Sequence, residues 1–287
     1  MLLVILSASQ CWSTDPKIPE LLKGKNKHHL PVFWKSNKTA WVTQTDFKEW
    51  FNHSFIPEVK QFLGGKNIAF KILLVLDNCK SHGDAIFLQH PNVTVEFLPA
   101  NTTSLIQPMD QTVIVTFKSH YLKLVIQNIK SAVNKHRGCE NFDSEYVVRD
   151  YWKKFTILDC IGYIDQSWQE CSDTTINRSW SKFLPELVVN PRKGSSSYEN
   201  NVESVVNMAR AVGGEGFVDI EETEVLEMVM PGNVVLSVQD VEEIVNQPSD
   251  PKQANEESEN NSEKQFYSSS VINCGDSRSD YDSLPEF

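Results

Sequence analysis

The chain has 287 residues, of which 40% are hydrophobic and 23% are charged, and its formal net charge is −11. This length allows either one domain with a sizeable core and a tail or two small domains. No run approaches the roughly 20 apolar residues of a membrane span, which favours a soluble, intracellular protein. The net charge is −16 over residues 194–287 and +5 over residues 1–193, so charge favours nucleic-acid contact only weakly and only in the first part.

The cysteines predict neither a zinc site nor a disulfide framework. There are six of them, and no two form a C-x-x-C pair. We therefore expect free or buried thiols in a reducing compartment.

The first part of the chain predicts strands followed by a helix. Residues 1–7 are apolar but lack the basic residues and the length of a signal peptide, so they predict a strand. Short strands are also predicted at residues 31–34 and 40–43. Residues 46–63 predict an amphipathic helix, opened by a capping box of Asp46 and Glu49 and kinked or interrupted at Pro57. Its apolar stripe belongs to the core and consists of Phe47, Trp50, Phe51, Phe55, Val59, Phe62 and Leu63.

Residues 70–117 carry the side chains that point to a function. The apolar run Ile72–Leu76 predicts a buried strand that ends on Asp77 and Asn78, and residues 93–98 predict a second buried strand. Open α/β sheets place chemistry at the carboxyl ends of strands. A helix then begins near Pro108, which suits a first helical position, and Asp110 falls in its first turn. Two carboxylates are therefore expected on one side of a sheet.

The helix that begins near Pro108 is predicted to be long. Its expected apolar face consists of Val113, Phe117, Tyr121, Leu124 and Ile129. The other surfaces of this helix carry Lys118, Lys123 and Lys130. The ordinary interpretation is that these lysines form a solvated helix face, and the more specific alternative is that they contact phosphate groups. Further helices are predicted near residues 157–168 and 176–183.

The chain is predicted to divide into three parts. Residues 1–190 form an α/β domain, and residues 191–246 form a linker and a weakly helical acidic segment. Residues 247–287 form an acidic tail, which is expected to be disordered because Ser, Asn, Glu and Asp dominate it and apolar side chains are few.

Two neighbouring carboxylates resist joint ionisation unless a cation joins them, and Mg²⁺ or Mn²⁺ is the usual cation for such oxygen ligands. Asp77 and Asp110 are accordingly the candidate metal ligands. The alternative is a turn or cap role, which is the commoner one for a lone Asp at a strand end. His82 could orient a carboxylate, contact phosphate or bond to a backbone carbonyl.

The strings LLVLDN-x-x-x-H and FLPANTTSLIQPMDQ resemble the DDE-superfamily transposase domain of the pogo/Tigger type, over roughly residues 1–187. The 32 residues between Asp77 and Asp110 fit that group. The resemblance implies a ribonuclease-H-like mixed sheet flanked by helices, in which two metals on three acids cut and join DNA. Asp77 matches the second acid and Asp110 the third, and Asn78 and His82 match residues that support the second.

The resemblance also implies that the domain is incomplete. Residues 1–10 resemble the strand that follows the motif of the first acid, so that acid and the family's helix-turn-helix DNA-binding region are expected to be absent. Asp15 is typical of a turn and is no substitute. Asp77 and Asp110 would then be vestigial, with no tightly bound Mg²⁺ or Mn²⁺.

We therefore expect a catalytically inactive, transposase-derived, nuclear protein with a residual nucleic-acid-binding or protein-interaction role. DNA is its expected partner, and no membrane is involved. The first alternative is an active metal-dependent DNA endonuclease or strand-transfer enzyme, which would need a third acid from elsewhere. The second is an acidic interaction protein that acts through residues 194–287.

Overall fold

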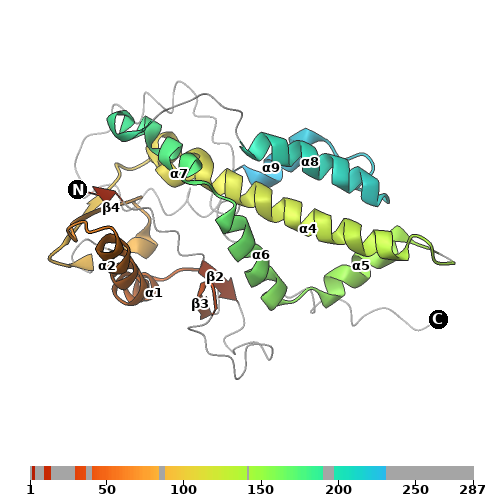
Figure 1. Cartoon of the computed structure of the whole chain (residues 1–287), viewed down its shortest axis with the longest axis horizontal. Coiled ribbons are helices and arrows are strands. Elements are labelled where there is room, and N and C mark those ends of the chain that lie inside the picture. The colour runs from red at the N-terminus through yellow and green to blue at the C-terminus, as the bar shows by residue number, and fades with distance from the viewer. Residues whose placement is uncertain are drawn as a thin grey trace. The chain divides into compact units, whose positions relative to one another are not determined.

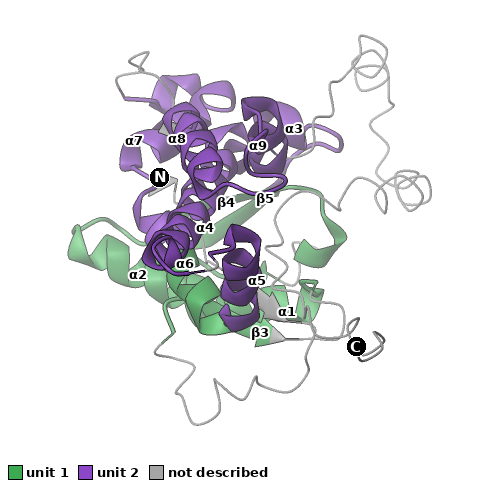
Figure 2. Cartoon of the chain, turned by 90° about the vertical axis from the view of Figure 1, so that its right-hand side faces the viewer, with its two compact units in different colours: residues 1–96, 156–165, 271–287 green, residues 97–155, 166–270 purple. Residues whose placement is uncertain are grey.

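The computed structural model describes residues 2–3, 10–13, 30–36, 41–83, 88–140, 142–189 and 197–230 (Figure 1). The chain forms two compact units (Figure 2). The first consists of residues 1–96, 156–165 and 271–287, and the second of residues 97–155 and 166–270. Within the described ranges, no helix is long and apolar enough to cross a membrane.

A three-stranded sheet in the order β1-β4-β5 carries the predicted site strand. β1 (Leu2–Leu3) runs parallel to β4 (Ile72–Leu76), with Leu2 opposite Ile72 and Leu3 opposite Leu73. β5 (Val93–Phe97) lies on the other side of β4. The prediction of three neighbouring strands is confirmed. Residues 1 and 4–7 of the first predicted strand lie outside the described residues.

A second, two-stranded parallel sheet pairs β2 (Gln10–Ser13) with β3 (Phe33–Ser36), and Gln10 lies opposite Phe33. β3 overlaps the strand predicted at residues 31–34. The strand predicted at residues 40–43 is wrong for residues 41–43, because Thr43 caps a helix instead of pairing in a sheet.

The helix predicted over residues 46–63 is present but begins earlier and contains a wide turn. It consists of α1 (Gln44–Trp50), a π-helical turn (Phe51–Phe55) and α2 (Ile56–Gly65). The capping box joins Thr43 to Asp46, one turn before the predicted pair. Pro57 has no amide to donate and would clash in a regular α-helix, so the extra residue of the π-helical turn accommodates it without ending the helix.

The apolar stripe of this helix is part of the core, as predicted, and it packs with residues of β4 and β5. The exception is Phe62, which remains 44% exposed. The buried core of the first unit consists of Phe47, Trp50, Phe51, Phe55, Val59, Leu63, Ile72, Leu74, Leu88 and Val93. The core therefore fixes β4, the strand that ends at Asp77, from the side of α1 and α2.

The second unit is helical. α3 (Thr103–Ile106) and a π-helical turn (Met109–Val113) lead into α4 (Ile114–His136), followed by α5 (Ser144–Lys154). α6 (Ile157–Gln169) contributes residues to both units, and α7 (Asp173–Ser179) and two short 3₁₀ turns (Trp180–Lys182 and Pro185–Leu187) follow it. α8 (Ser197–Val212) and α9 (Glu222–Val229) complete the described residues.

The long helix buries only part of the apolar face predicted for it, of which Val113 and Ile129 are buried. The buried positions of α4 are Val115, Thr116, Ser119, Val125, Ile126, Ile129 and Val133. Phe117, Tyr121 and Leu124 are only half-buried. The reason is that α8, α5 and α9 all pack against α4, and α8 lies along it (Figure 1).

α8 and α9 lie within residues 191–246, for which a linker and a weakly helical segment are predicted. α8 buries Val202, Val205, Val206, Ala209 and Val212. Their spacing of three or four residues places them on one helix face. The structure describes residues 197–230 of this segment, and most of them are part of a packed helical unit rather than a linker.

The cysteine prediction holds in part. Cys79, Cys139 and Cys171 are free, and burial raises the pKa of the Cys171 thiol to about 12. Cys160 is disulfide-bonded, so the expectation of free thiols is wrong there, and its partner is not among the described side chains.

Candidate functional site

Asp77 is the first residue after β4, and its side chain is sheltered. Ile72 and Leu74 alternate into the core, and this alternation fixes the register in which the strand ends. The exposed fraction of the side chain is 15% for Asp77 and 20% for His82. Asn78, between them in the chain, is exposed.

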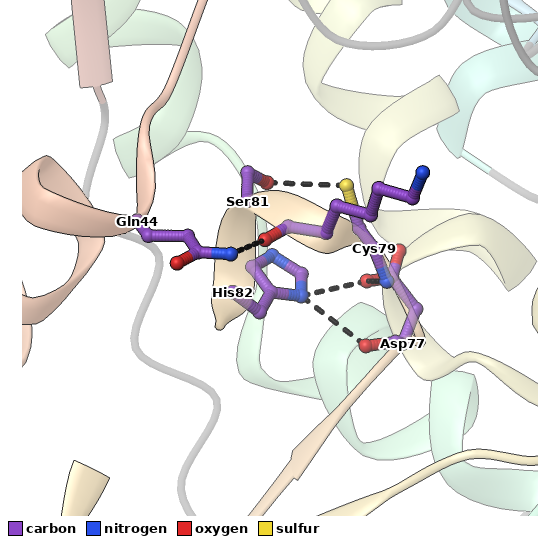
Figure 3. Close-up of polar contacts among 6 residues, drawn as sticks. Gln44, Asp77, Cys79, Ser81 and His82 are labelled. Carbon is purple, nitrogen blue, oxygen red and sulfur yellow. Dashed lines mark hydrogen bonds and ion pairs between the residues drawn. The ribbon is translucent and has the colours of Figure 1, made fainter. Parts of the chain in front are cut away.

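His82 and the backbone of Cys79 both bind the Asp77 carboxylate. His82 Nδ1 lies 2.7 Å from Asp77 Oδ1, and the Cys79 amide donates to the same oxygen at 3.2 Å (Figure 3). His82 Nδ1 also lies 3.3 Å from the Asp77 carbonyl oxygen. Because an ionised carboxylate only accepts hydrogen bonds, this arrangement assigns a proton to Nδ1. Both contacts use Oδ1, which leaves Oδ2 as the oxygen that could bind a cation.

The turn after Asp77 is anchored to α1 (Figure 3). The Phe47 ring packs on the His82 ring with centroids 4.5 Å apart, and Gln44 Nε2 donates to the Lys80 carbonyl at 2.9 Å. Gly83 ends the turn with φ 70° and ψ −172°. Residues other than glycine rarely adopt this backbone conformation. No local sequence pattern marks Phe47 or Gln44 as supporting residues, because they lie more than 25 positions from Asp77.

Asp110 lies in the π-helical turn at the start of α4. Pro108 precedes the turn, and the Asp110 amide donates to the Gln107 carbonyl at 3.1 Å. π-helical turns occur frequently at functional sites. Asp77 belongs to the first unit and Asp110 to the second. The prediction that both carboxylates face one cleft therefore stays a prediction.

The three predicted phosphate-binding lysines differ in their surroundings. Burial lowers the pKa of Lys118, and the nearby Asp110 carboxylate opposes that shift. Lys123 Nζ donates to Asn201 Oδ1 of α8 at 3.1 Å, and Lys130 is half-buried. Lys123 is thus engaged by the protein itself, and nucleic-acid contact by these lysines stays a prediction.

A buried polar network joins α4 to α8. Asn201 is only 4% exposed, and its Nδ2 donates to Ser119 Oγ at 3.1 Å and to His120 Nδ1 at 3.2 Å. Burial lowers the pKa of His120, Glu170 opposes that shift, and Lys123 adds to it. This network joins residues about 80 positions apart, and no local sequence pattern marks it.

The described residues do not by themselves form a metal cage. No three His, Cys, Asp or Glu side chains within the described ranges are grouped so that they could hold a metal ion. Asp77 fits Mg²⁺ or Mn²⁺ by residue type, because these ions prefer oxygen ligands. A complete site would need further oxygens from elsewhere.

Sequence comparison gives a family match. Residues 3–180 match the family described as DDE superfamily endonuclease. The chain is 30% identical over 196 residues to the human Tigger transposable element-derived protein 7. This alignment covers 62% of the chain and 35% of that protein. It is also 28% identical over 173 residues to the mouse Jerky protein, in an alignment that covers 60% of the chain and 27% of that protein.

A third relative is the CENP-B homolog protein 2 of Schizosaccharomyces pombe, which is 30% identical over 115 residues, 37% of this chain and 21% of that protein. The chain thus spans about a third or less of the length of these curated relatives. No solved structure matches it. The predicted relationship to pogo/Tigger-type transposable-element-derived proteins is confirmed.

Proposed function

Because this chain belongs to the DDE superfamily endonuclease family, we propose that it is a transposase-derived domain that binds nucleic acid or protein without cutting DNA. The supporting observation is the environment of Asp77. Its Oδ1 accepts from His82 and from the Cys79 amide, and the carboxylate lies in no three-residue ligand cluster of the described residues.

Coordination chemistry connects this observation to activity. Phosphodiester cleavage by two metals requires ions about 3.5–4 Å apart that stabilise the attacking and the leaving oxygen. Mg²⁺ demands near-octahedral oxygen geometry and loses water reluctantly. Asp77 and Asp110 alone offer few oxygens for two such ions, so any bound cation would be poorly positioned. Asn78 and His82 would then support the turn around Asp77 rather than a reaction.

The fold, the partner and the location are part of the same proposal. The parallel pairing of β1 with β4, next to β5, supports an incomplete ribonuclease-H-like sheet flanked by helices. DNA in the nucleus is the proposed partner, by resemblance to the family. Of the three lysines, Lys130 is the best placed for phosphate contact, because Lys123 binds Asn201 and Lys118 lies near Asp110.

A nicking assay on supercoiled DNA tests the absence of cleavage. With Mg²⁺ or Mn²⁺, the chain alone should convert no more plasmid than a protein-free control. Asp77→Ala and Asp110→Ala should change nothing, and Glu140→Ala, an exposed loop variant, serves as the matched control. Metal-dependent nicking that disappears in either aspartate variant would show a third ligand within this chain and establish the alternative, an active endonuclease or strand-transfer enzyme.

The acidic interaction role is the second alternative. α8 and α9 pack in the second unit. An acidic segment that recruits partners would therefore be sought in residues 231–287, which carry 12 acidic and three basic residues.

A further inference from the structure

One face of α5, called the α5 face below, presents cationic and aromatic side chains to solvent. Tyr146, Arg149 and Lys153 share this face by helical spacing, and Trp152 lies beside them. Tyr146 is 66% exposed and Trp152 is 45% exposed, while Arg149 and Lys153 are also exposed. Val147 is buried, on the side where α5 packs against α4.

The two cations on the α5 face are uncompensated within the protein. Lys154 Nζ lies 2.7 Å from Asp150 Oδ2, which neutralises that lysine. No side chain in the described ranges forms an ion pair with Arg149 or Lys153. Glu145 is also exposed on this helix, so the surface suits a partner with a few carboxylates better than a polyanion such as DNA.

The aromatic part of the α5 face is held in place. The Trp152 ring meets the Phe155 ring at 5.4 Å and the Tyr151 ring at 5.5 Å, both edge to face. A held aromatic ring loses little conformational entropy on binding. Trp, Tyr and Arg are also the residue types that contribute most to protein interfaces. The α5 face therefore has the composition of a docking surface for an acidic protein surface that carries apolar side chains.

A second exposed face of the same unit has this complementary composition. Glu224, Glu227 and Met228 of α9 share it by helical spacing and form the α9 face. Both glutamates are exposed, and Met228 is 59% exposed. The two valines of α9 are buried, so the α9 face points away from the packed side of the helix. Residues 211–230 contain six acidic residues and no lysine or arginine, which makes this surface strongly acidic.

The two faces belong to one packed unit but do not neutralise each other. Both helices pack against α4 (Figure 2), and the turn before α9 meets the start of α5, where a Cβ on Gly214 would lie 3.3 Å from Ser144 Oγ. No cation of the described residues forms an ion pair with Glu224 or Glu227. Two copies related by a two-fold axis can pair each α5 face with the α9 face of the other copy.

We propose that the chain forms a symmetric dimer in which the α5 face of one copy docks on the α9 face of the other. Arg149 and Lys153 pair with Glu224 and Glu227, and the Trp152 ring packs on the Met228 side chain. Charge complementarity selects this pairing, because two α5 faces or two α9 faces would repel each other. The contact is independent of the proposed binding of nucleic acid.

Sedimentation equilibrium of the full chain tests the proposal. Arg149→Glu with Lys153→Glu should weaken the dimer about tenfold or more, since four exposed ion pairs are lost across the two contacts. Glu224→Gln with Glu227→Lys should do the same. Gln at position 224 keeps the side-chain oxygen that accepts from the Glu221 amide at 2.9 Å, so the start of α9 stays capped.

An equimolar mixture of the two double variants gives the sharpest result. Each variant alone has like charges at both contacts of a dimer. A mixed dimer has one contact of wild-type charge and one contact in which both charges are reversed. The mixture should therefore form dimers again, and native mass spectrometry identifies them as mixed when one variant is ¹⁵N-labelled.

Matched variants control for charge. Lys60→Glu with Lys71→Glu reverses two exposed cations of the first unit. Glu199→Gln with Glu203→Lys changes two exposed acids of α8 by the same amount as the α9 variant. Both controls should leave the dimer unchanged, and circular dichroism should show the same helical content for all variants.

Four results would overturn the proposal. The first is a wild-type chain that is monomeric or forms assemblies larger than a dimer. The second is a dimer that neither the α5 variant nor the α9 variant weakens. The third is a mixture of the two folded variants that forms no dimer. The fourth is binding of a DNA duplex that is lost in the α5 variant while the dimer persists, which would assign the α5 face to nucleic acid.

Discussion

His82 joins the turn after β4 to helix α1. Its ring packs on Phe47, and its Nδ1 lies 2.7 Å from Asp77 Oδ1. Both side chains of the pair are at least four-fifths sheltered from solvent. A hydrogen bond to a charged group in such a place contributes more to stability than a neutral one on the surface.

His82→Ala should therefore lower the free energy of unfolding by about 1–3 kcal/mol, measured by urea denaturation. His82→Asn should recover part of this loss, because an amide nitrogen can donate from near the position of Nδ1. His53→Ala, at an exposed position, should change the free energy by no more than about 0.5 kcal/mol. Equal effects at both histidines would mean that the contact with Asp77 is not formed.

His120 gives the α4–α8 contact a pH dependence. Burial lowers the pKa of His120, Glu170 opposes the shift, and Lys123 adds to it. Above the ordinary histidine pKa of about 6.5, the ring is neutral in both the folded and the unfolded chain. Below that pH the unfolded chain binds the proton first, so stability should fall until the pH has passed the lower pKa of the folded state.

Chemical unfolding between pH 8 and pH 5 measures this effect. The free energy of unfolding of the wild-type chain should fall more steeply below about pH 6.5 than that of His120→Gln, which cannot titrate. Both chains share every other ionisable group, so the difference between the two curves isolates His120. Parallel curves would contradict the network of His120 and Asn201.

At the scale of elements, local sequence patterns predict the strands and helices whose bounds depend on local interactions. The apolar run of β4 has the same bounds in the sequence and in the structure, because one face of the strand is buried and the other is partly buried, which gives a continuous apolar signal. The long helix after Pro108 was also predicted, since proline and the apolar repeat both mark it. The capping box was misplaced because Thr43-Asp46 and Asp46-Glu49 have the same spacing.

Pairings between distant elements could not be predicted in the same way. The buried face of α4 is set by α8, and one polar contact between the two helices joins Asn201 to Ser119 at 3.1 Å. α8 shows the helical spacing of Val202, Val205 and Val206, but no local pattern states which helix it meets. The candidate site shows the same difference. The strand before Asp77 marks that residue in the sequence, whereas no local pattern marks Phe47 or Gln44 as its supporting residues.

At the scale of the whole molecule, the packing of α8 bears on where the chain can be shortened. α8 buries four valines and Ala209. Burying a valine side chain contributes about 1.5–3 kcal/mol, so removing α8 should cost on the order of 5 kcal/mol or more. That loss is comparable with the total stability of a typical domain, which is about 5–15 kcal/mol.

A chain truncated after residue 190 should therefore lose the cooperative unfolding of its second unit, whereas one truncated after Met230 should keep it. Circular dichroism during urea unfolding measures this, and the chain ending at 190 should also bind a hydrophobic dye through the exposed face of α4. The chain ending at 230 is the matched control, because it retains every described residue. If both chains unfolded in the same transition, residues 191–246 would act as the linker that composition alone predicts, and the α4–α8 packing would carry no stability.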